Sequence, residues 1–291
     1  MKNLALTVLT LVVFGCADQT GSGTVTQKTI RIGVLPDQSH QRLQDQYAPL
    51  MAYLEKTTSL DVELVIPANY STMLAEFADG HLQLANFGGL TYTQAEHRSR
   101  AMPLIMRDTD LNFTSCFVVK TSDPRRMIKE FKGETIAFGP PLSTSGHLMP
   151  RRFLSLSGIE PEQFFSSIRH SSGHDETVQW VSDGVAAIGA ANCVIAQSML
   201  GANSTDAHQL RIISTTPTYA NYVWAVQDSM DSSTRTLLRD AFLALDQTIA
   251  EHEEILNRLG AQGYVPAGRA DFDDIRNAAD ALGLLDAKNS N

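Results

Sequence analysis

Three consecutive hydroxyl residues, Ser143, Thr144 and Ser145, stand between two segments of different periodicity. The preceding apolar run, residues 135–138, predicts a buried strand, and residues 147–156 have helical apolar spacing. A helix that begins at Ser143 leaves its first backbone N–H groups unpaired beside three hydroxyls. Such a group of donors suits an anion. Ser143 as an ordinary helix N-cap is the alternative, and this turn alone does not decide between them.

His174 is the strongest titratable candidate for the same site. As an imidazolium it is a charge-assisted donor, and as a neutral ring it donates from one nitrogen only. The alternative is that it caps a helix beginning at Asp175. Asp175 or Glu176 is a candidate acceptor for the hydrogen of a protonated phosphorus oxyanion, a hydrogen that sulfate and selenate lack. Both acids also suit an ordinary first helical turn.

The elements that position these residues form two α/β units followed by C-terminal helices. The expected elements, in chain order, are strand 30–35, helix 41–57, strand 61–66, helix 71–79, strand 82–87, a helix from the 88–92 turn to 98, strands 102–106 and 115–120, helix 124–131, strand 135–138, helix 143–156, strand 167–170, helix 175–182, strand 186–191, helix 194–200, strands 210–214 and 221–226, a long helix from 232 to about 252, and helix 270–284. Alternating strands and helices predict mixed, mostly parallel sheets flanked by helices. Ligands of such sheets lie at the carboxyl ends of the strands, here in a cleft between two lobes.

The N-terminus is a targeting segment. Lys2 precedes an apolar run, residues 4–14, which is too short to span a bilayer as a helix. The run ends in Val13-Phe14-Gly15-Cys16, which resembles a bacterial lipobox, so we expect a signal peptide at 1–15 and lipidation of Cys16. A plain signal peptide is the alternative. Residues 16–28 are rich in Gly, Ser and Thr and predict a tether.

Composition narrows the class of function. The chain has 291 residues, 43% of them hydrophobic, and a formal charge of −9. Removing residues 1–15 leaves 22 basic and 32 acidic residues, a charge of −10. An acidic chain without basic runs argues against nucleic acid as a partner. The sequence contains no phosphate loop, Cys-x-x-Cys or His-Glu-x-x-His motif, so we expect no cofactor and no metal.

Nucleophilic catalysis is another function that Ser145, His174 and Asp175 could suggest. The run 142–146 lacks the leading glycine of a Gly-x-Ser-x-Gly elbow, and adjacent His and Asp residues cannot easily act in relay. We therefore do not expect an enzyme.

The mature chain resembles the phosphate, phosphite and phosphonate group of periplasmic substrate-binding proteins, the PhnD-like family. The matching stretches, in order, are Tyr47-Ala48-Pro49-Leu50, Phe87-Gly88-Gly89-Leu90-Thr91-Tyr92, Lys132-Gly133-Glu134-Thr135, Ser143-Thr144-Ser145-Gly146 and Gly173-His174-Asp175. The resemblance implies the two-lobed type II substrate-binding fold, with lobe 1 at 29–117 and 218–291 and lobe 2 at 118–217. The 88–92 run departs from the phosphonate branch and is closer to a branch named for selenate and arsenic oxyanions.

The resemblance also implies the ligand-binding residues. In the family the Ser-Thr-Ser turn and the histidine of the Gly-His-Asp stretch hold the phosphoryl oxygens, and the first lobe adds a tyrosine. Carried over by motif, these positions are Ser143, Thr144, Ser145, His174 and Tyr92, with Tyr47 and the helix start near Thr91 as further candidates.

The remaining pocket candidates are aromatic residues and cysteines. Tyr219 is expected to line the pocket, whereas Tyr222 and Trp224 alternate in a strand and are expected in the core. Cys116 and Cys193 lie in apolar runs and are expected as buried free thiols, because sequence alone cannot place them within bridging distance. Ligation of trivalent arsenic by Cys116, as in arsenite-sensing relatives, is the less favoured alternative.

The resemblance implies a small oxyanion as the ligand. Relatives that bind aminoalkyl phosphonates carry a carboxylate for the ammonium group, where this chain has Ala187 in the run 184–187. We therefore expect a monomeric periplasmic lipoprotein that captures phosphate, phosphite, a phosphonate or a related oxyanion for an ABC importer. A binding protein that signals to a membrane histidine kinase is the alternative.

Overall fold

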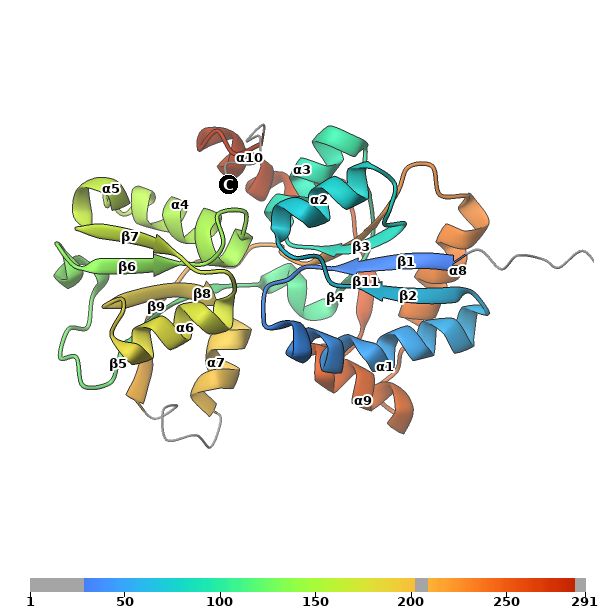
Figure 1. Ribbon diagram of the computed structural model, residues 1–291, viewed down its shortest axis with the longest axis horizontal. Helices are drawn as coiled ribbons and strands as arrows, with labels where there is room; N and C mark the ends of the chain where they lie inside the picture. The colour runs from blue at the N-terminus through green and yellow to red at the C-terminus, as the bar shows by residue number, and fades with distance from the viewer. Residues whose placement is uncertain (1–28, 202–208, 286–291) are drawn as a thin grey trace, which may run out of the picture.

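The computed structural model describes residues 29–201 and 209–285 (Figure 1). The expected signal peptide, Cys16 and the tether lie outside these residues. Within the described residues, no helix is both long enough and apolar enough to cross a bilayer.

The chain forms two mixed β-sheets, one in each lobe (Figure 1). The first sheet has the strand order β11-β4-β10-β3-β1-β2 and the second β7-β6-β8-β5-β9. The strands are β1 Thr29–Val34, β2 Asp61–Val65, β3 Leu84–Phe87, β4 Met102–Arg107, β5 Ser115–Lys120, β6 Thr135–Phe138, β7 Ser167–His170, β8 Ile188–Asn192, β9 Leu210–Thr215, β10 Val223–Val226 and β11 Tyr264–Pro266.

Each sheet combines a parallel part with an antiparallel part. In the first, β1 pairs in parallel with β2 and β3, while β10 is antiparallel to β3 and β4. In the second, β6 is parallel to β7 and β8, and β5 is antiparallel to β8 and β9. The parallel strands carry the connections that end at the cleft, so their carboxyl ends supply the candidate site.

Helices cover both faces of each sheet. They are α1 His40–Thr58, α2 Tyr70–Ala78, α3 Gly89–Ser99, α4 Met149–Leu156, α5 Pro161–Phe164, α6 His174–Asp183, α7 Cys193–Gly201, α8 Ser232–Leu243, α9 Ala250–Leu259 and α10 Asp273–Ala281. In the first lobe α1, α8 and α9 bury one face, and α2, α3 and α10 bury the other. In the second lobe α4 and α6 pack on opposite faces. Trp224 is 1% exposed in the first core, which confirms its predicted core position.

The chain crosses between the lobes twice, at 108–114 and 216–222. The two crossings pair with each other, because Phe113 N–H donates to the Tyr219 carbonyl at 2.9 Å and Tyr219 N–H donates back at 3.0 Å. Strand β5 belongs to the second sheet from its first residue, so residues 115–117 lie in the second lobe instead of the first.

Two predicted helices are wrong in extent. Residues 124–131 form only a short 3₁₀ turn at Ile128–Phe131, because the Asp123 carboxylate takes the N–H of Arg125 and holds the chain in a side-chain turn. The long helix expected from 232 to about 252 is broken between α8 and α9. There the Asp246 carboxylate accepts the N–H of Thr248 at 2.8 Å.

Candidate ligand-binding site

The turn after β6 places three hydroxyls at the cleft. Ser143 has extended backbone angles and its Oγ accepts the Gly146 N–H at 3.0 Å. The helix that follows begins as a π-helical turn, Thr144–Leu148, before α4. Ser143 is therefore an N-cap, and its hydroxyl also lies 3.3 Å from His174 Nε2.

Gly146 is required by the close approach of this turn to its neighbours. A Cβ at this position would lie 2.8 Å from His174 Cε1 and 2.9 Å from Gly139 Cα. The Gly139 N–H also donates to the Gly146 carbonyl at 2.8 Å. The absence of a side chain thus lets the turn fold back on β6 and on the histidine.

His174 is fully buried at the first position of α6. Its Nε2 lies 3.3 Å from Ser143 Oγ and 3.4 Å from Ser145 Oγ, and its Nδ1 accepts the Asn192 N–H at 3.2 Å. Because Nδ1 is the acceptor, the proton of the neutral ring lies on Nε2 and points at the serines. Burial lowers the pKa of His174 to about 3, so the ring is a neutral donor and not the imidazolium considered from the sequence. We call Ser143, Thr144, Ser145 and His174 the second-lobe cluster.

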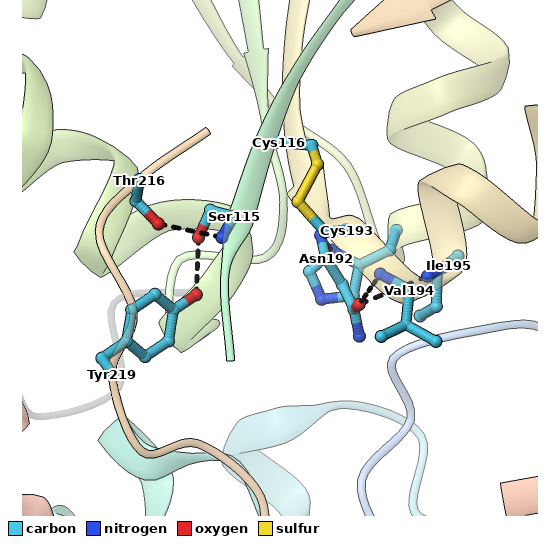
Figure 2. The surroundings of a disulfide bond; sticks show 9 residues. Ser115, Cys116, Asn192, Cys193, Val194, Ile195, Thr216 and Tyr219 are labelled. Atoms are coloured by element: carbon cyan, nitrogen blue, oxygen red, sulfur yellow. Dashed lines mark hydrogen bonds between the residues drawn. A yellow bond between two sulfur atoms is a disulfide. The ribbon is translucent and has the colours of Figure 1, made fainter. Parts of the chain in front are cut away.

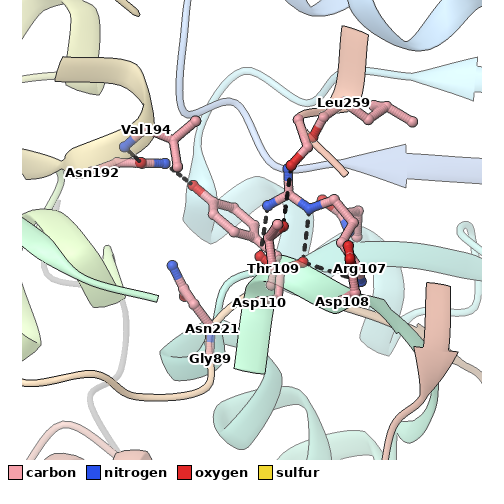
Figure 3. A network of polar contacts seen from close by, with 12 residues as sticks. Gly89, Arg107, Asp108, Thr109, Asp110, Asn192, Val194, Asn221 and Leu259 are labelled. Carbon is pink, nitrogen blue, oxygen red and sulfur yellow. Dashed lines mark hydrogen bonds and ion pairs between the residues drawn. The ribbon is translucent and has the colours of Figure 1, made fainter. Parts of the chain in front are cut away.

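Opposite this cluster, the N-terminus of α3 and two buried side chains form a first-lobe cluster of Tyr70, Gly89, Leu90 and Asn221. Leu90 N–H donates to Thr144 Oγ1 at 2.8 Å, a direct contact between the lobes. Gly89 N–H donates to Asn221 Oδ1 at 3.1 Å. Figure 3 shows the Asn221 amide pointing from its crossing segment toward the space between the lobes.

Two donors of the first-lobe cluster lack a well-formed hydrogen bond to the protein. Tyr70 is 4% exposed and Asn221 1%, yet the Asn221 Nδ2 makes no hydrogen bond and the Tyr70 hydroxyl has only a weak contact with the Ser143 side chain. Burial and the nearby Asp37 raise the pKa of Tyr70, so its hydroxyl keeps its proton. A buried unpaired donor costs free energy unless something else accepts its hydrogen. Both groups therefore point to an acceptor supplied by a ligand.

Thr91 and Tyr92, the other predicted ligand-binding residues of α3, direct their side chains to protein groups. The Thr91 hydroxyl donates to the Gly88 carbonyl within its own helix. The Tyr92 ring packs on Phe272 at 4.7 Å and its hydroxyl lies 3.4 Å from Glu96 Oε1, so the prediction of Tyr92 as a ligand donor is wrong in its geometry.

Tyr47 and Asp175 lie at the cleft but bind protein groups. The Tyr47 hydroxyl donates to Asn86 Oδ1 at 3.2 Å, beside a cleft cavity of about 440 Å³. Asp175 Oδ2 accepts the Ser39 N–H at 3.1 Å, which links α6 of the second lobe to the start of α1. Asp175 thus joins the lobes and does not join the donor clusters.

Asp37, Tyr222 and Asn192 are cleft residues that the sequence analysis missed. Asp37 follows β1 and Asn192 ends β8, so both lie at carboxyl ends of strands, the signal that could have found them. The Tyr222 hydroxyl donates to the Asp37 carboxylate and accepts from Asn192 Nδ2 at 3.1 Å. Tyr222 was expected in the core; its ring is buried, but its hydroxyl belongs to the cleft.

Arg107 lines the cleft without a net positive charge. Its Nε and Nη2 each donate to the Asp110 carboxylate at 2.7 Å, and its Nη1 donates to the Leu259 carbonyl (Figure 3). The guanidinium lies 5.1 Å above the Tyr222 ring. Asp110 balances this cation, and the donors of the two clusters are themselves neutral hydroxyl, amide and imidazole groups.

Cys116 and Cys193 form a disulfide, which corrects the prediction of free thiols (Figure 2). Their Cα atoms are 4.9 Å apart, across the β5 and β8 pair of the second lobe. Residues next to the disulfide reach the second-lobe cluster. Ser115 Oγ lies 2.6 Å from the hydroxyl of Tyr219, which also contacts Ser145, and Asn192 contacts His174. A bonded sulfur cannot ligate arsenic, so that alternative is removed.

Ala187 does not lie at the site. Its N–H donates to the carbonyl of Thr135, the first residue of β6, whereas the hydroxyl turn follows the last residue, Phe138. The alanine is thus at the opposite end of the sheet. Its lack of a carboxylate gives no information on the ligand, and the argument based on it is wrong.

The fold and its paired donor clusters define a two-lobed solute-binding protein. The family model for "ABC transporter, phosphonate, periplasmic substrate-binding protein" matches residues 32–272, and the chain belongs to this family. It is a family of transport proteins that bind substrate in the periplasm.

Relatives over nearly the full chain have names that refer to phosphorus compounds. The "Probable ABC transporter phosphite binding protein PhnD1" of Prochlorococcus marinus is 28% identical over 89% of this chain and 91% of its own. The "Phosphate-import protein PhnD" of Mycolicibacterium smegmatis is 25% identical over 88% of this chain and 86% of its own. The structure of Prochlorococcus PhnD1 in complex with methylphosphonate superimposes with a TM-score of 0.85 at 27% identity, covering 89% of this chain and 99% of that one.

Proposed function

We propose that this protein captures a small phosphorus oxyanion, such as phosphite or methylphosphonate, and delivers it to an ABC importer. The observation that carries the proposal is a pair of buried donors without a well-formed hydrogen bond to the protein: Tyr70 Oη, beside Ser143, and Asn221 Nδ2, beside the start of α3. A tetrahedral oxyanion offers acceptors to both sides at once.

The character of the donors supports an anion of small size. Ser143, Ser145 and His174 are each no more than 2% exposed, so an anion held by them is itself buried, which favours a small one. Neutral, preorganised donors replace the hydration of the anion without a buried cation. The relative PhnD1 is named for phosphite and its structure holds methylphosphonate, the same class of ligand.

The place of action follows from the family and the N-terminal sequence. Periplasmic binding proteins of importers present their closed, liganded form to a membrane permease. We propose that acylation of Cys16 tethers the protein to a membrane, because the run 13–16 resembles a lipobox. The branch named for selenate and arsenic oxyanions stays a prediction.

A thermal-shift panel tests the ligand class. The mature chain carrying Cys16→Ser is melted with phosphate, phosphite, methylphosphonate, sulfate, selenate, arsenate and arsenite. A ligand present at 100 times its Kd stabilises the folded state by about 2.7 kcal/mol, so the true ligand should stand out. We expect the largest rise in Tm with phosphite or methylphosphonate and none with sulfate. A response to sulfate or selenate alone, or to no oxyanion, would contradict the proposal.

A further inference from the structure

Four buried residues close a ring of hydrogen bonds across the two lobes. His174 N–H donates to the Asp37 carbonyl at 2.8 Å, and Asn192 N–H donates to His174 Nδ1 at 3.2 Å. Asn192 Nδ2 donates to the Tyr222 hydroxyl at 3.1 Å, and that hydroxyl donates to the Asp37 carboxylate. This series of four hydrogen bonds therefore begins and ends at Asp37.

The members of the ring come from separate parts of the chain. Asp37 belongs to the first lobe, His174 and Asn192 to the second, and Tyr222 to a crossing segment. None is more than 6% exposed. The ring can exist only when the lobes are together, because two of its four bonds, those to Asp37 and Tyr222 from the second lobe, span the cleft.

Asn192 is held on the second-lobe side by two further constraints. Its Oδ1 accepts the N–H groups of Val194 at 2.8 Å and Ile195 at 3.3 Å, which caps α7. The next residue, Cys193, is bonded to Cys116 of β5 (Figure 2). The donor to His174 Nδ1 thus has a fixed position, and it also fixes which nitrogen of His174 carries the proton.

The surroundings of Asp37 are mostly polar and carry charges of both signs. Asp175 from α6 and Arg107 from β4 act on it electrostatically in opposite directions. The titratable groups facing it from the packed elements are Tyr47, Tyr70, Arg107, Asp175 and Tyr222. Only Tyr222 among them is hydrogen-bonded to its carboxylate.

We propose that Asp37, Asn192 and Tyr222 are positioning residues that couple closure of the lobes to the orientation of the His174 donor. This inference rests on the proposed function for its ligand. Asn192 sets the His174 ring from within the second lobe, and the bonds to Asp37 and Tyr222, which form only in the closed arrangement, then hold the Nε2–H in place toward Ser143 and Ser145. A ligand that accepts from Nε2 then stabilises the same arrangement that the ring stabilises.

A double-mutant cycle between Tyr222→Phe and His174→Ala tests the coupling, with methylphosphonate and phosphite as probes in titration calorimetry. Tyr222→Phe removes one donor and one acceptor and should weaken binding about tenfold. In the His174→Ala background the same change should have a smaller effect, because the part that acts through the imidazole is gone and only the part that acts through closure of the lobes is left. Equal effects in both backgrounds would show a merely structural role and overturn the proposal.

Two neutral variants of Asp37 provide a rescue test. Asp37→Asn keeps an oxygen acceptor for the Tyr222 hydroxyl and Asp37→Ala does not, so the alanine variant should bind about tenfold more weakly than the asparagine variant. Equal affinities of the two variants would contradict the proposal. Tyr53→Phe is the matched control, because this buried hydroxyl donates to the Ala241 carbonyl within the first lobe and should not affect affinity.

A measurement without ligand separates failure of this inference from failure of the proposed function. If the wild type binds neither probe, the proposed function fails. Small-angle scattering of the unliganded proteins then decides the inference. Tyr222→Phe should have a larger radius of gyration than the wild type and Tyr53→Phe the same one. Equal radii for the wild type and Tyr222→Phe would overturn it.

Discussion

The two donor clusters that face each other across the cleft are built on different principles. In the second-lobe cluster each group has a partner within the protein: Ser143 caps its turn, Thr144 accepts from Leu90, and His174 lies against two hydroxyls. In the first-lobe cluster Tyr70 and Asn221 hold donors without a well-formed hydrogen bond to the protein. Donors of the second-lobe cluster stabilise the fold and also bind the ligand. Donors of the first-lobe cluster bind the ligand but lower the stability of the unliganded protein, because they are buried without a good hydrogen bond. Mutations in the second-lobe cluster should therefore lower both ligand affinity and the free energy of unfolding, whereas mutations in the first-lobe cluster should lower affinity alone.

The largest effect is expected in the second-lobe cluster. His174→Ala removes the Nε2–H donor and leaves the Asn192 N–H buried without its acceptor. We expect affinity for the ligand to fall about a hundredfold and the free energy of unfolding to fall by about 2–3 kcal/mol. Titration calorimetry and urea unfolding measure the two quantities. His252→Ala is the control, because its ring accepts from Asp246 N–H far from the cleft. Unchanged affinity would remove His174 from the site.

Tyr70→Phe should affect affinity alone. Its hydroxyl makes no well-formed hydrogen bond to the protein, so removing it should leave the free energy of unfolding nearly unchanged while weakening binding about tenfold. Tyr53→Phe should show the reverse, with about 1 kcal/mol less stability and affinity within twofold of the wild type. A Tyr70→Phe protein that is markedly less stable but binds normally would contradict the distinction between the clusters.

The pH dependence of binding should come from Asp37 and not from His174. Burial raises the pKa of Asp37 to about 6 in the closed structure, above its ordinary value of 3.8. A raised carboxyl pKa means that closure favours the protonated form. The favourable contribution of Asp37 to closure is therefore fully present when the pH is below 3.8, its ordinary pKa. This contribution is lost as the pH rises through about 6, its pKa in the closed structure. His174 stays neutral from pH 5 to 8, because its pKa is lowered to about 3.

We expect wild-type affinity, relative to that of Asp37→Asn, to rise by about tenfold from pH 7 to pH 5. The ratio to Asp37→Asn cancels the ionisation of the ligand itself, which both proteins share. Calorimetry in buffers of different ionisation enthalpy should also detect proton uptake on binding by the wild type near pH 6. A constant ratio between pH 5 and 7 would show that Asp37 does not change its exposure on closure.

The smallest effect is expected at Ala187. Because Ala187 lies at the end of the sheet away from the hydroxyl turn, Ala187→Asp should change affinity for methylphosphonate by less than twofold. It should also not create affinity for aminoethylphosphonate. Calorimetry with both compounds measures this, and gain of aminoethylphosphonate binding would restore the sequence argument that the structure overturns.

The parts of the site that were predictable from sequence are those with local signals. A strand followed by three hydroxyls at the start of a helix identifies the Ser143 turn as a candidate without knowledge of the rest of the chain. The fold class was also accessible, because alternating strands and helices determine layers of helices around mixed sheets. Ser115–Lys120, Thr135–Phe138 and Ser167–His170 agree with the expected strands residue for residue.

The residues that were missed or misplaced depend on contacts distant in sequence. Tyr92 lies in the first turn of α3, and its direction toward Phe272 is set by packing against the C-terminal part of the chain. Cys116 and Cys193 are 77 residues apart, and only the pairing of β5 with β8 brings them together. Asp37 and Tyr222 are 185 residues apart, so neither pattern nor propensity indicates their contact.

A crystal structure of the protein with methylphosphonate or phosphite tests the central claim most directly. We predict that the phosphorus oxygens lie within hydrogen-bond distance of the second-lobe cluster, at Ser143, Ser145 and His174 Nε2, and of the Tyr70 hydroxyl and the Asn221 Nδ2. An anion bound instead only in the 440 Å³ cleft cavity beside Tyr47 and Arg107, with Tyr70 and Asn221 still unpaired, would contradict it.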